Sequence, residues 1–263
     1  MGGYFAKIPE STVQWLLNQK VFWVATAPLS PTGHINISPK GGPDRYFGLT
    51  ADNRQFWYLD LTGSGSETVS HLYENGRITV QFNAFEGAPR IMRLYGYGKV
   101  LEYGTSAFKK FVDQYSIDTI PGSRTIILVD IHQVGFACGY SVPKYEFKEH
   151  RTVLNDQFAK KEQKYLAGDE KEDITRYWAE KNSYSMDGLP GTLIAIDTSE
   201  KKGIKPLQKM EGPHAPARNL RPPVGYRLEQ MILVAISSAL VATLLVLYGP
   251  RVDLTVLKRG KEF

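Results

Sequence analysis

The chain has 263 residues, of which 42% are hydrophobic and 22% are charged, and this composition is typical of a globular protein rather than a disordered one. Its net charge of +5 would suit nucleic-acid binding, but residues 201–229 hold seven basic and two acidic residues and so account for the whole excess. The body before residue 201 is therefore not basic, and no nucleic-acid groove is expected on it. The single cysteine, Cys138, excludes an intramolecular disulfide and favours a reducing compartment.

Six segments read as β-strands, because apolar and polar residues alternate along them. The clearest is RITVQFNAF at 77–85, where Ile78, Val80 and Phe82 share one face. The other five are 21–29, 34–40, 55–61, 93–102 and 125–136. The turn at 30–34 makes the first two a hairpin. A short helix is expected at 11–18, and because few helices lie between the six strands, we predict an antiparallel β-barrel over residues 1–140.

The pattern changes after residue 140. Charged helical stretches predict a helical extension of the barrel domain at 141–200, and the prolines and bases of 201–229 predict a linker. Residues 231–248 carry no charge, and a helix of that length nearly matches a hydrocarbon layer of about 30 Å. We therefore predict a transmembrane helix at 230–249 and a short basic tail at 250–263, with a buried core helix as the alternative.

Such an anchor implies where the protein lies in the cell. It predicts a membrane protein with a single C-terminal span, whose barrel faces the cytosol and whose partners include membrane lipid. Bases flank both ends of the span, so the charge pattern does not decide its orientation.

The loop LTGSGSET at 61–68 follows an aromatic strand and precedes a helical stretch. Ser64 and Glu67 have the spacing of a capping box, which predicts that the helix starts near Ser64. Gly63 and Gly65 have no side chain to block a ligand, and the amides and dipole of a helix start favour an anion. The alternative is a glycine-rich turn whose capping box satisfies itself.

Other motifs are not supported by the spacing of their residues. The loop lacks the Gly-Lys-Ser/Thr ending of a nucleotide-binding P-loop, and it does not fit the serine-hydrolase motif GxSxG. The five histidines are dispersed without the spacing of metal ligands, so no metal is predicted. The histidines are His34, His71, His132, His150 and His214.

Four segments together resemble the pyridoxamine 5′-phosphate oxidase-like family of FMN-binding split barrels. They are WVATAPLSPTGHINISPKG at 23–41, FWYLDLTGSGSETVSHLYENGRITVQFNAFEG at 56–87, RLYGYGKV at 93–100 and EKNSYSMDGLPG at 180–191. The resemblance covers about the first 190 residues, and the last segment resembles the end of one subgroup without an assigned substrate. It implies a six-stranded split β-barrel that forms a homodimer, with FMN in the groove between the subunits.

The resemblance also implies which residues hold the cofactor. The FMN phosphate would be bound by the loop, and the second strand would contribute nearby groups. Carried over to this sequence, the cofactor-binding residues are Ser38, Lys40, Thr62, Gly63, Ser64, Gly65, Ser66 and Thr68.

Two departures from the family bear on function. Where the named oxidase has a Ser-Arg-Lys run at the start of the helix, this chain has Ser66-Glu67-Thr68, so two phosphate-binding cations are absent. Lys40, Arg90 or Arg93 are candidates to replace them. The C-terminal Arg-x-His element that grips the phosphorylated substrate is also missing, so oxidation of vitamin B6 is not predicted.

Side chains outside the loop have weaker assignments. The strand aromatics, such as Trp57 and Tyr58, are expected in the core or a dimer interface, with one or two of them free to stack on a flavin ring. Cys138 is a candidate to face the flavin, although a buried, inert thiol explains it better. In the extension, Asn182 and Asp187 are candidates for a substrate pocket, together with Arg176 and Lys181, although a solvated helix face explains them better.

The resulting hypothesis is an FMN-dependent oxidoreductase that is reduced by a nicotinamide cofactor or another donor and has an unknown substrate. No residue of the chain is required to transfer a proton, because the flavin carries the chemistry. The alternative is a non-catalytic flavin or haem binder that serves as a sensor, scavenger or scaffold.

Overall fold

The structure is a computed structural model, and it describes residues 2–43 and 46–215. Its strands are β1 (Gly3–Phe5), β2 (Val21–Thr26), β3 (Asn36–Gly41), β4 (Phe47–Leu49), β5 (Gln55–Leu61), β6 (Arg77–Asn83), β7 (Ile91–Glu102) and β8 (Ser123–Ala137). Its helices are α1 (Glu10–Leu17), α2 (Glu67–Asn75), α3 (Ser106–Tyr115), α4 (Val153–Leu166), the short 3₁₀ helix η1 (Glu170–Glu172), α5 (Ile174–Lys181) and α6 (Leu193–Lys202).

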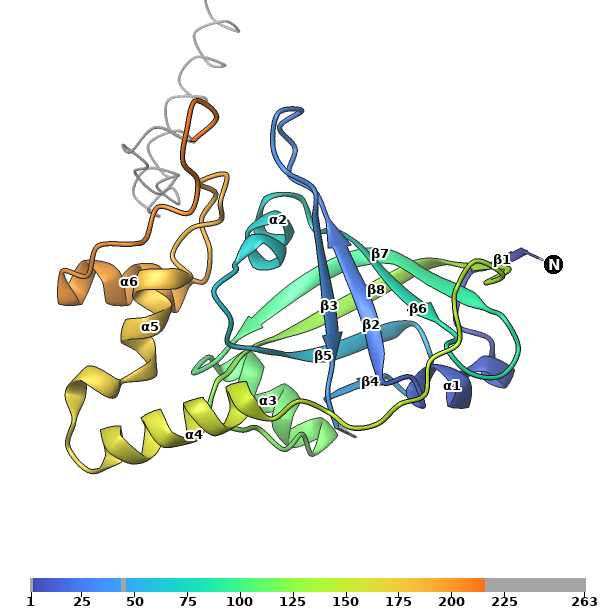
Figure 1. The fold of residues 1–263 in the computed structure, drawn as a ribbon, viewed down its shortest axis with the longest axis horizontal. Coiled ribbons are helices and arrows are strands. Elements are labelled where there is room, and N and C mark those ends of the chain that lie inside the picture. The colour runs from blue at the N-terminus through green and yellow to red at the C-terminus, as the bar shows by residue number, and fades with distance from the viewer. Residues whose placement is uncertain (1, 44–45, 216–263) are drawn as a thin grey trace, which may run out of the picture. The chain divides into compact units, whose positions relative to one another are not determined.

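All strand pairs are antiparallel, and the sheet runs in the order β3-β2-β6-β7-β8-β5-β4, with β1 added to β8. The sheet is curled (Figure 1), and this arrangement is consistent with the predicted split barrel. The six predicted strands correspond to β2, β3, β5, β6, β7 and β8, so the alternation of apolar and polar residues predicted them correctly.

Two apolar cores hold the sheet and its helices together. Alternate residues of β2, β5 and β6 point into the curl, where Phe22, Phe56 and Phe82 are buried and pack edge to face or tilted. The opposite face of β5 buries Trp57 and Leu59 with residues of α3 and β8. Strand β5 is thus covered on both faces, which fixes the position of the loop that follows it.

The helical extension lies at one side of the sheet (Figure 1). Helices α5 and α6 pack against each other, and α4 packs against α5. Trp178 of α5 is 1% exposed, and its indole Nε1 donates a hydrogen bond to Thr62 Oγ1 at 2.8 Å. The extension is therefore attached to Thr62, the first residue of the segment 62–68 that follows β5, which we call the glycine loop.

The predicted transmembrane helix is not borne out. Within residues 2–43 and 46–215, no helix is long and apolar enough to cross a membrane. The longest of them, α4, has only 14 residues and several charges, whereas a span requires about 20 apolar residues. The finding contradicts the predicted membrane location and leaves the lipid partner without support. The segment 230–249, on which those predictions rested, lies outside the described residues.

Candidate functional site

The glycine loop connects β5 to α2, and its backbone N–H groups are the main feature of the site. From Gly63 to Thr68, these groups donate no hydrogen bond to another described residue. Ser64 and Gly65 are exposed, and a Cβ added at Gly63 would have no atom within 4 Å. Open space borders Gly63, whereas a Cβ at Gly65 would lie 2.6 Å from Glu67 Oε2. A run of N–H groups without acceptors can bind an anion such as a phosphate.

Helix α2 begins at Glu67, and its N-cap is Ser66, whose side chain makes no capping hydrogen bond. The predicted start near Ser64, with its Ser64–Glu67 capping box, is therefore wrong. The extension explains the difference, because Ser66 Oγ donates to the carbonyl oxygen of Tyr184 at 2.8 Å. The Glu67 carboxylate likewise accepts from the backbone N–H of Met186 at 3.2 Å. The capping groups are thus occupied by tertiary contacts, and the helix amides are left free.

The carbonyl groups of the loop are held from two sides. Asn182 is buried and its Nδ2 donates to the carbonyl oxygen of Gly63 at 2.9 Å. Arg124, at the start of β8, donates from Nη1 to the carbonyl oxygen of Gly65 at 2.8 Å. Two carbonyls of the loop are thus engaged, while its N–H groups from Gly63 to Thr68 have no acceptor among the described residues.

A buried ion cluster lies directly before the loop. Asp60, near the end of β5, is 1% exposed and accepts from Lys40 Nζ at 2.7 Å, from Arg124 Nη2 at 2.5 Å and from Arg124 Nε at 3.1 Å. Burial alone would raise the pKa of Asp60, but Arg124 and Lys40 together hold it well below its ordinary value. Asp60 is therefore ionised, and since β3 and β5 are separated in the sheet order, the cluster also closes the curl between them.

The predicted cofactor residues differ in how free their side chains are. Thr62 Oγ1 donates to the carbonyl oxygen of Gly122 at 2.7 Å and accepts from Trp178, so this hydroxyl serves the fold. Thr68 Oγ1 accepts from Asn36 Nδ2 at 3.0 Å, and Ser38 Oγ donates to Asn36 Oδ1 at 3.1 Å. The inner face of β3 is thereby connected to the first turn of α2, as expected if both belong to one site.

The cations at the loop are not all those that the sequence suggested. Arg90 stacks on Trp15, with 5.0 Å between the guanidinium carbon and the ring centroid. Arg93 lies near the start of β7, at the opposite end of that strand from Glu102. Sequence reasoning missed Arg124, because it directly precedes the strand predicted at 125–136 and nothing local relates it to the loop, and it missed Lys209, because that residue stands in the predicted linker. Lys209 Nζ lies 3.1 Å from Ser66 Oγ and 3.5 Å from Glu67 Oε1.

Residues of the extension also have definite roles. Asp187, which we expected on a solvated face, accepts from the backbone N–H of His34 at 2.7 Å and pairs with His34 Nδ1 at 2.6 Å. This contact fixes the β2–β3 hairpin against the extension. Cys138 is exposed, contrary to expectation.

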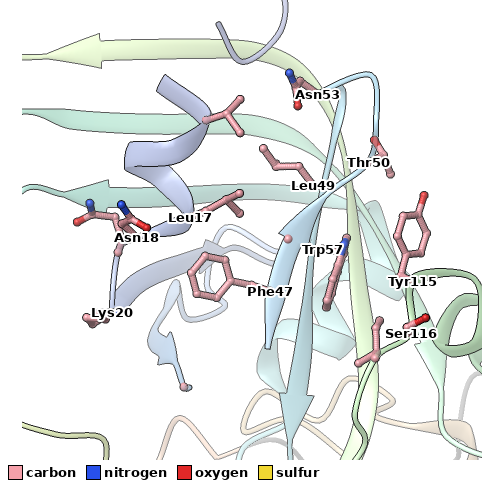
Figure 2. A pocket seen from close by; sticks show the side chains of 15 residues that line it. Leu17, Asn18, Lys20, Phe47, Leu49, Thr50, Asn53, Trp57, Tyr115 and Ser116 are labelled. Atoms are coloured by element: carbon pink, nitrogen blue, oxygen red, sulfur yellow. The ribbon is translucent and has the colours of Figure 1, made fainter. Parts of the chain in front are cut away.

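Two clefts of the described residues lie near the sheet and the extension. One, of about 740 Å³, is lined by α1, β4 and the end of α3, with Phe47, Leu49 and Trp57 among its side chains (Figure 2). No residue of the glycine loop lines it. The other, of about 960 Å³, is lined by the extension, including Tyr184, Met186 and Lys209, which all contact Ser66 or Glu67. No residue of the loop lines this cleft either, but these three contacts place it next to the start of α2.

Comparison with known proteins indicates the family of this chain. The family model described as pyridoxamine 5′-phosphate oxidase matches residues 8–138. The pyridoxamine 5′-phosphate oxidase family protein ustO of Aspergillus flavus is 34% identical over 200 residues, which cover 73% of this chain and 79% of that protein.

Solved structures that are similar to part of the chain include the following two, both with low TM-scores. HupZ of Group A Streptococcus is 22% identical, with a TM-score of 0.36, and the match covers 48% of this chain and 92% of that chain. A FAD-binding protein of Mesorhizobium loti is 13% identical, with a TM-score of 0.32, and the match covers 52% of this chain and 96% of that chain. The matches to the family model and to ustO show that the chain belongs to the pyridoxamine 5′-phosphate oxidase family.

Proposed function

We propose that this protein binds FMN, with the phosphate on the loop at 62–68, and that it is a flavin-dependent oxidoreductase. The observation that carries the proposal is the row of backbone N–H groups from Gly63 to Thr68, which have no acceptor among the described residues. Membership of the family supports a flavin as the bound group. When bound, the flavin supplies the electron-transfer chemistry, and the chain binds and orients it.

The charges around the loop fit a phosphate monoester. Three cations, Lys40, Arg124 and Lys209, lie within contact distance of two carboxylates, Asp60 and Glu67. The cluster keeps one net positive charge, to which the helix dipole and the free amides add. Such a site compensates a phosphate without the Arg-Lys pair that the helix start lacks.

A buried polar atom beside the loop also fits a bound cofactor. Asn182 Oδ1 is fully buried and has no hydrogen-bond partner among the described residues. A buried acceptor of this kind is costly unless a donor reaches it, and the hydroxyl groups of the FMN ribityl chain are donors. We propose that Asn182 holds the loop with its Nδ2 and the cofactor with its Oδ1.

The remaining parts of the proposal are the partners and the reaction. A homodimer and a nicotinamide electron donor are proposed from the family resemblance, and the substrate is left open. Because the Arg-x-His element is missing from the sequence, pyridoxamine phosphate is not proposed as the substrate.

Replacing Gly63 with valine tests the loop. No atom lies within 4 Å of a Cβ at this position, so the free energy of unfolding should change by less than about 0.5 kcal/mol. The side chain would occupy the space next to the amides, and the affinity for FMN should fall about tenfold or more, which corresponds to about 1.4 kcal/mol. Fluorescence titration of the full chain with FMN measures the effect.

A matched substitution, Ala88→Val, serves as the control, because Ala88 is exposed in the turn between β6 and β7. It should leave FMN affinity unchanged. Equal FMN affinity in Gly63→Val and the unchanged protein would remove the loop from the cofactor site. A Soret absorption band in the purified protein, in place of flavin bands, would favour the haem-binding alternative.

A further inference from the structure

Residues 203–211 return from the end of α6 to the glycine loop. The backbone N–H of Leu207 donates to the carbonyl oxygen of Glu180 at 2.8 Å, which holds this segment against α5. Two residues later, Lys209 places its Nζ 3.1 Å from Ser66 Oγ. The side chain of Lys209 is only 13% exposed, although lysines are usually at the surface. A lysine that stays buried needs compensation for its charge.

The compensation within the described residues is incomplete. The distance from Lys209 Nζ to Glu67 Oε1 is 3.5 Å, whereas charge-assisted hydrogen bonds are typically about 2.7–2.9 Å long. The same Glu67 oxygen also accepts from the backbone N–H of Met186. Burial lowers the pKa of Lys209 and Arg124 lowers it further, while Glu67 acts in the opposite direction. An anion beside Nζ would therefore stabilise the charged lysine.

The position of Lys209 matches the place where the anion is proposed. Ser66 is the N-cap of α2 and belongs to the run of residues whose N–H groups lack acceptors. An ammonium group carries three donors, and Ser66 and Glu67 use at most two of them. At least one N–H of Lys209 is thus left without an acceptor among the described residues.

We infer that Lys209 contacts the phosphate monoester of the bound cofactor directly, and that residues 203–211 form one wall of the site. The inference rests on the proposed function, because it assigns a residue to the same anion site. It gives the chain a replacement for the missing helix cations that comes from a different part of the sequence. Lys209 also lines the cleft of about 960 Å³ in the extension.

The test compares FMN with riboflavin, which has the same ring and ribityl chain but no phosphate. The full chain and its Lys209→Met variant are titrated with each ligand, and flavin fluorescence reports binding. Methionine keeps the length and apolar stem of the side chain and removes the charge. The variant should bind FMN about tenfold or more weakly, because a hydrogen bond to a charged group is lost. Riboflavin affinity should not change.

Two controls separate charge from folding. Lys201→Met removes a charge from an exposed side chain of α6 that pairs with Asp197, and it should leave both affinities unchanged. Lys209→Arg keeps the positive charge but changes the shape of the side chain. It should retain most of the FMN affinity if the charge is what matters, whereas a purely structural role of the lysine gives no reason for arginine to retain it.

The outcomes are distinct. Unchanged FMN affinity in Lys209→Met would overturn this inference while leaving the proposed function in place. An equal loss of FMN and riboflavin affinity would also overturn it, because the lysine would then act on the site as a whole. If the unchanged protein binds neither ligand, the proposed function fails and the inference fails with it.

Discussion

Replacing Asp60 with asparagine is expected to lower the free energy of unfolding by about 3–5 kcal/mol, because it removes one partner from a buried ion cluster. Asp60 is 1% exposed, and it is the carboxylate that lies between Lys40 and Arg124. Without it, both cations remain inside the protein with no compensating charge. Urea unfolding followed by circular dichroism measures the loss.

The control for Asp60 is a carboxylate in an exposed ion pair. Asp197 pairs with Lys201 one turn along α6, and both side chains are more than half exposed. Asp197→Asn should cost less than about 1 kcal/mol, as exposed pairs usually do. Equal losses in the two variants would contradict the special role given to Asp60.

The ion cluster also predicts how stability depends on pH. Burial alone would raise the pKa of Asp60, but Arg124 and Lys40 hold it well below its ordinary value. A carboxyl with a lowered folded-state pKa contributes its stability above the unfolded-state pKa of about 3.9, and loses it as the pH falls towards the folded value. The unchanged protein should therefore lose stability steadily below about pH 4. Because asparagine does not titrate, Asp60→Asn should show a shallower loss over the same range in acid unfolding monitored by tryptophan fluorescence.

Replacing Trp178 with alanine should lower the free energy of unfolding by about 3–5 kcal/mol. Its ring is 1% exposed and packs edge to face against Tyr103, while Nε1 donates to Thr62 Oγ1. The substitution leaves a cavity between α5 and the start of the loop, so the contacts of Asn182 and Lys209 with the loop should weaken as well. Urea unfolding gives the loss in stability, and limited proteolysis of the extension gives the loss of local order.

The milder Trp178→Phe variant separates packing from the hydrogen bond. Phenylalanine keeps most of the apolar volume and lacks the indole donor, so the cost should be about 1–3 kcal/mol. A cost as large as that of alanine would show that the hydrogen bond to Thr62, rather than the filled volume, attaches the extension.

The barrel could be predicted from sequence because its signal is local. Alternation along single strands, as in Ile78, Val80 and Phe82, reports directly which face is buried. The pairing of β3 with β2 was predicted from the turn signals at 30–34. The short strands β1 and β4, of three residues each, were not predicted, because so few residues show no period.

The site was predicted only where its residues lie next to one another in the sequence. The glycine loop, and β3 with Ser38 and Lys40, were found, and the contacts of Asn36 with Thr68 and of Lys40 with Asp60 join them in the structure. Arg124 and Lys209 were not found, because nothing local marks a cation inside a strand or a proline-rich segment as a neighbour of the loop. The predicted capping box was wrong for the same reason. Side chains at the start of α2 are engaged instead by residues of the extension more than a hundred positions away.

We propose that the loop at 62–68 binds a flavin phosphate. Titration of the purified full chain with FMN measures this binding. The visible absorption spectrum is recorded as FMN is added, with riboflavin titrated in parallel. We expect the flavin bands to shift on binding and FMN to bind more tightly than riboflavin. Equal binding of the two ligands, or no binding of either, would contradict it, and the six free amides would then belong to a turn without a ligand.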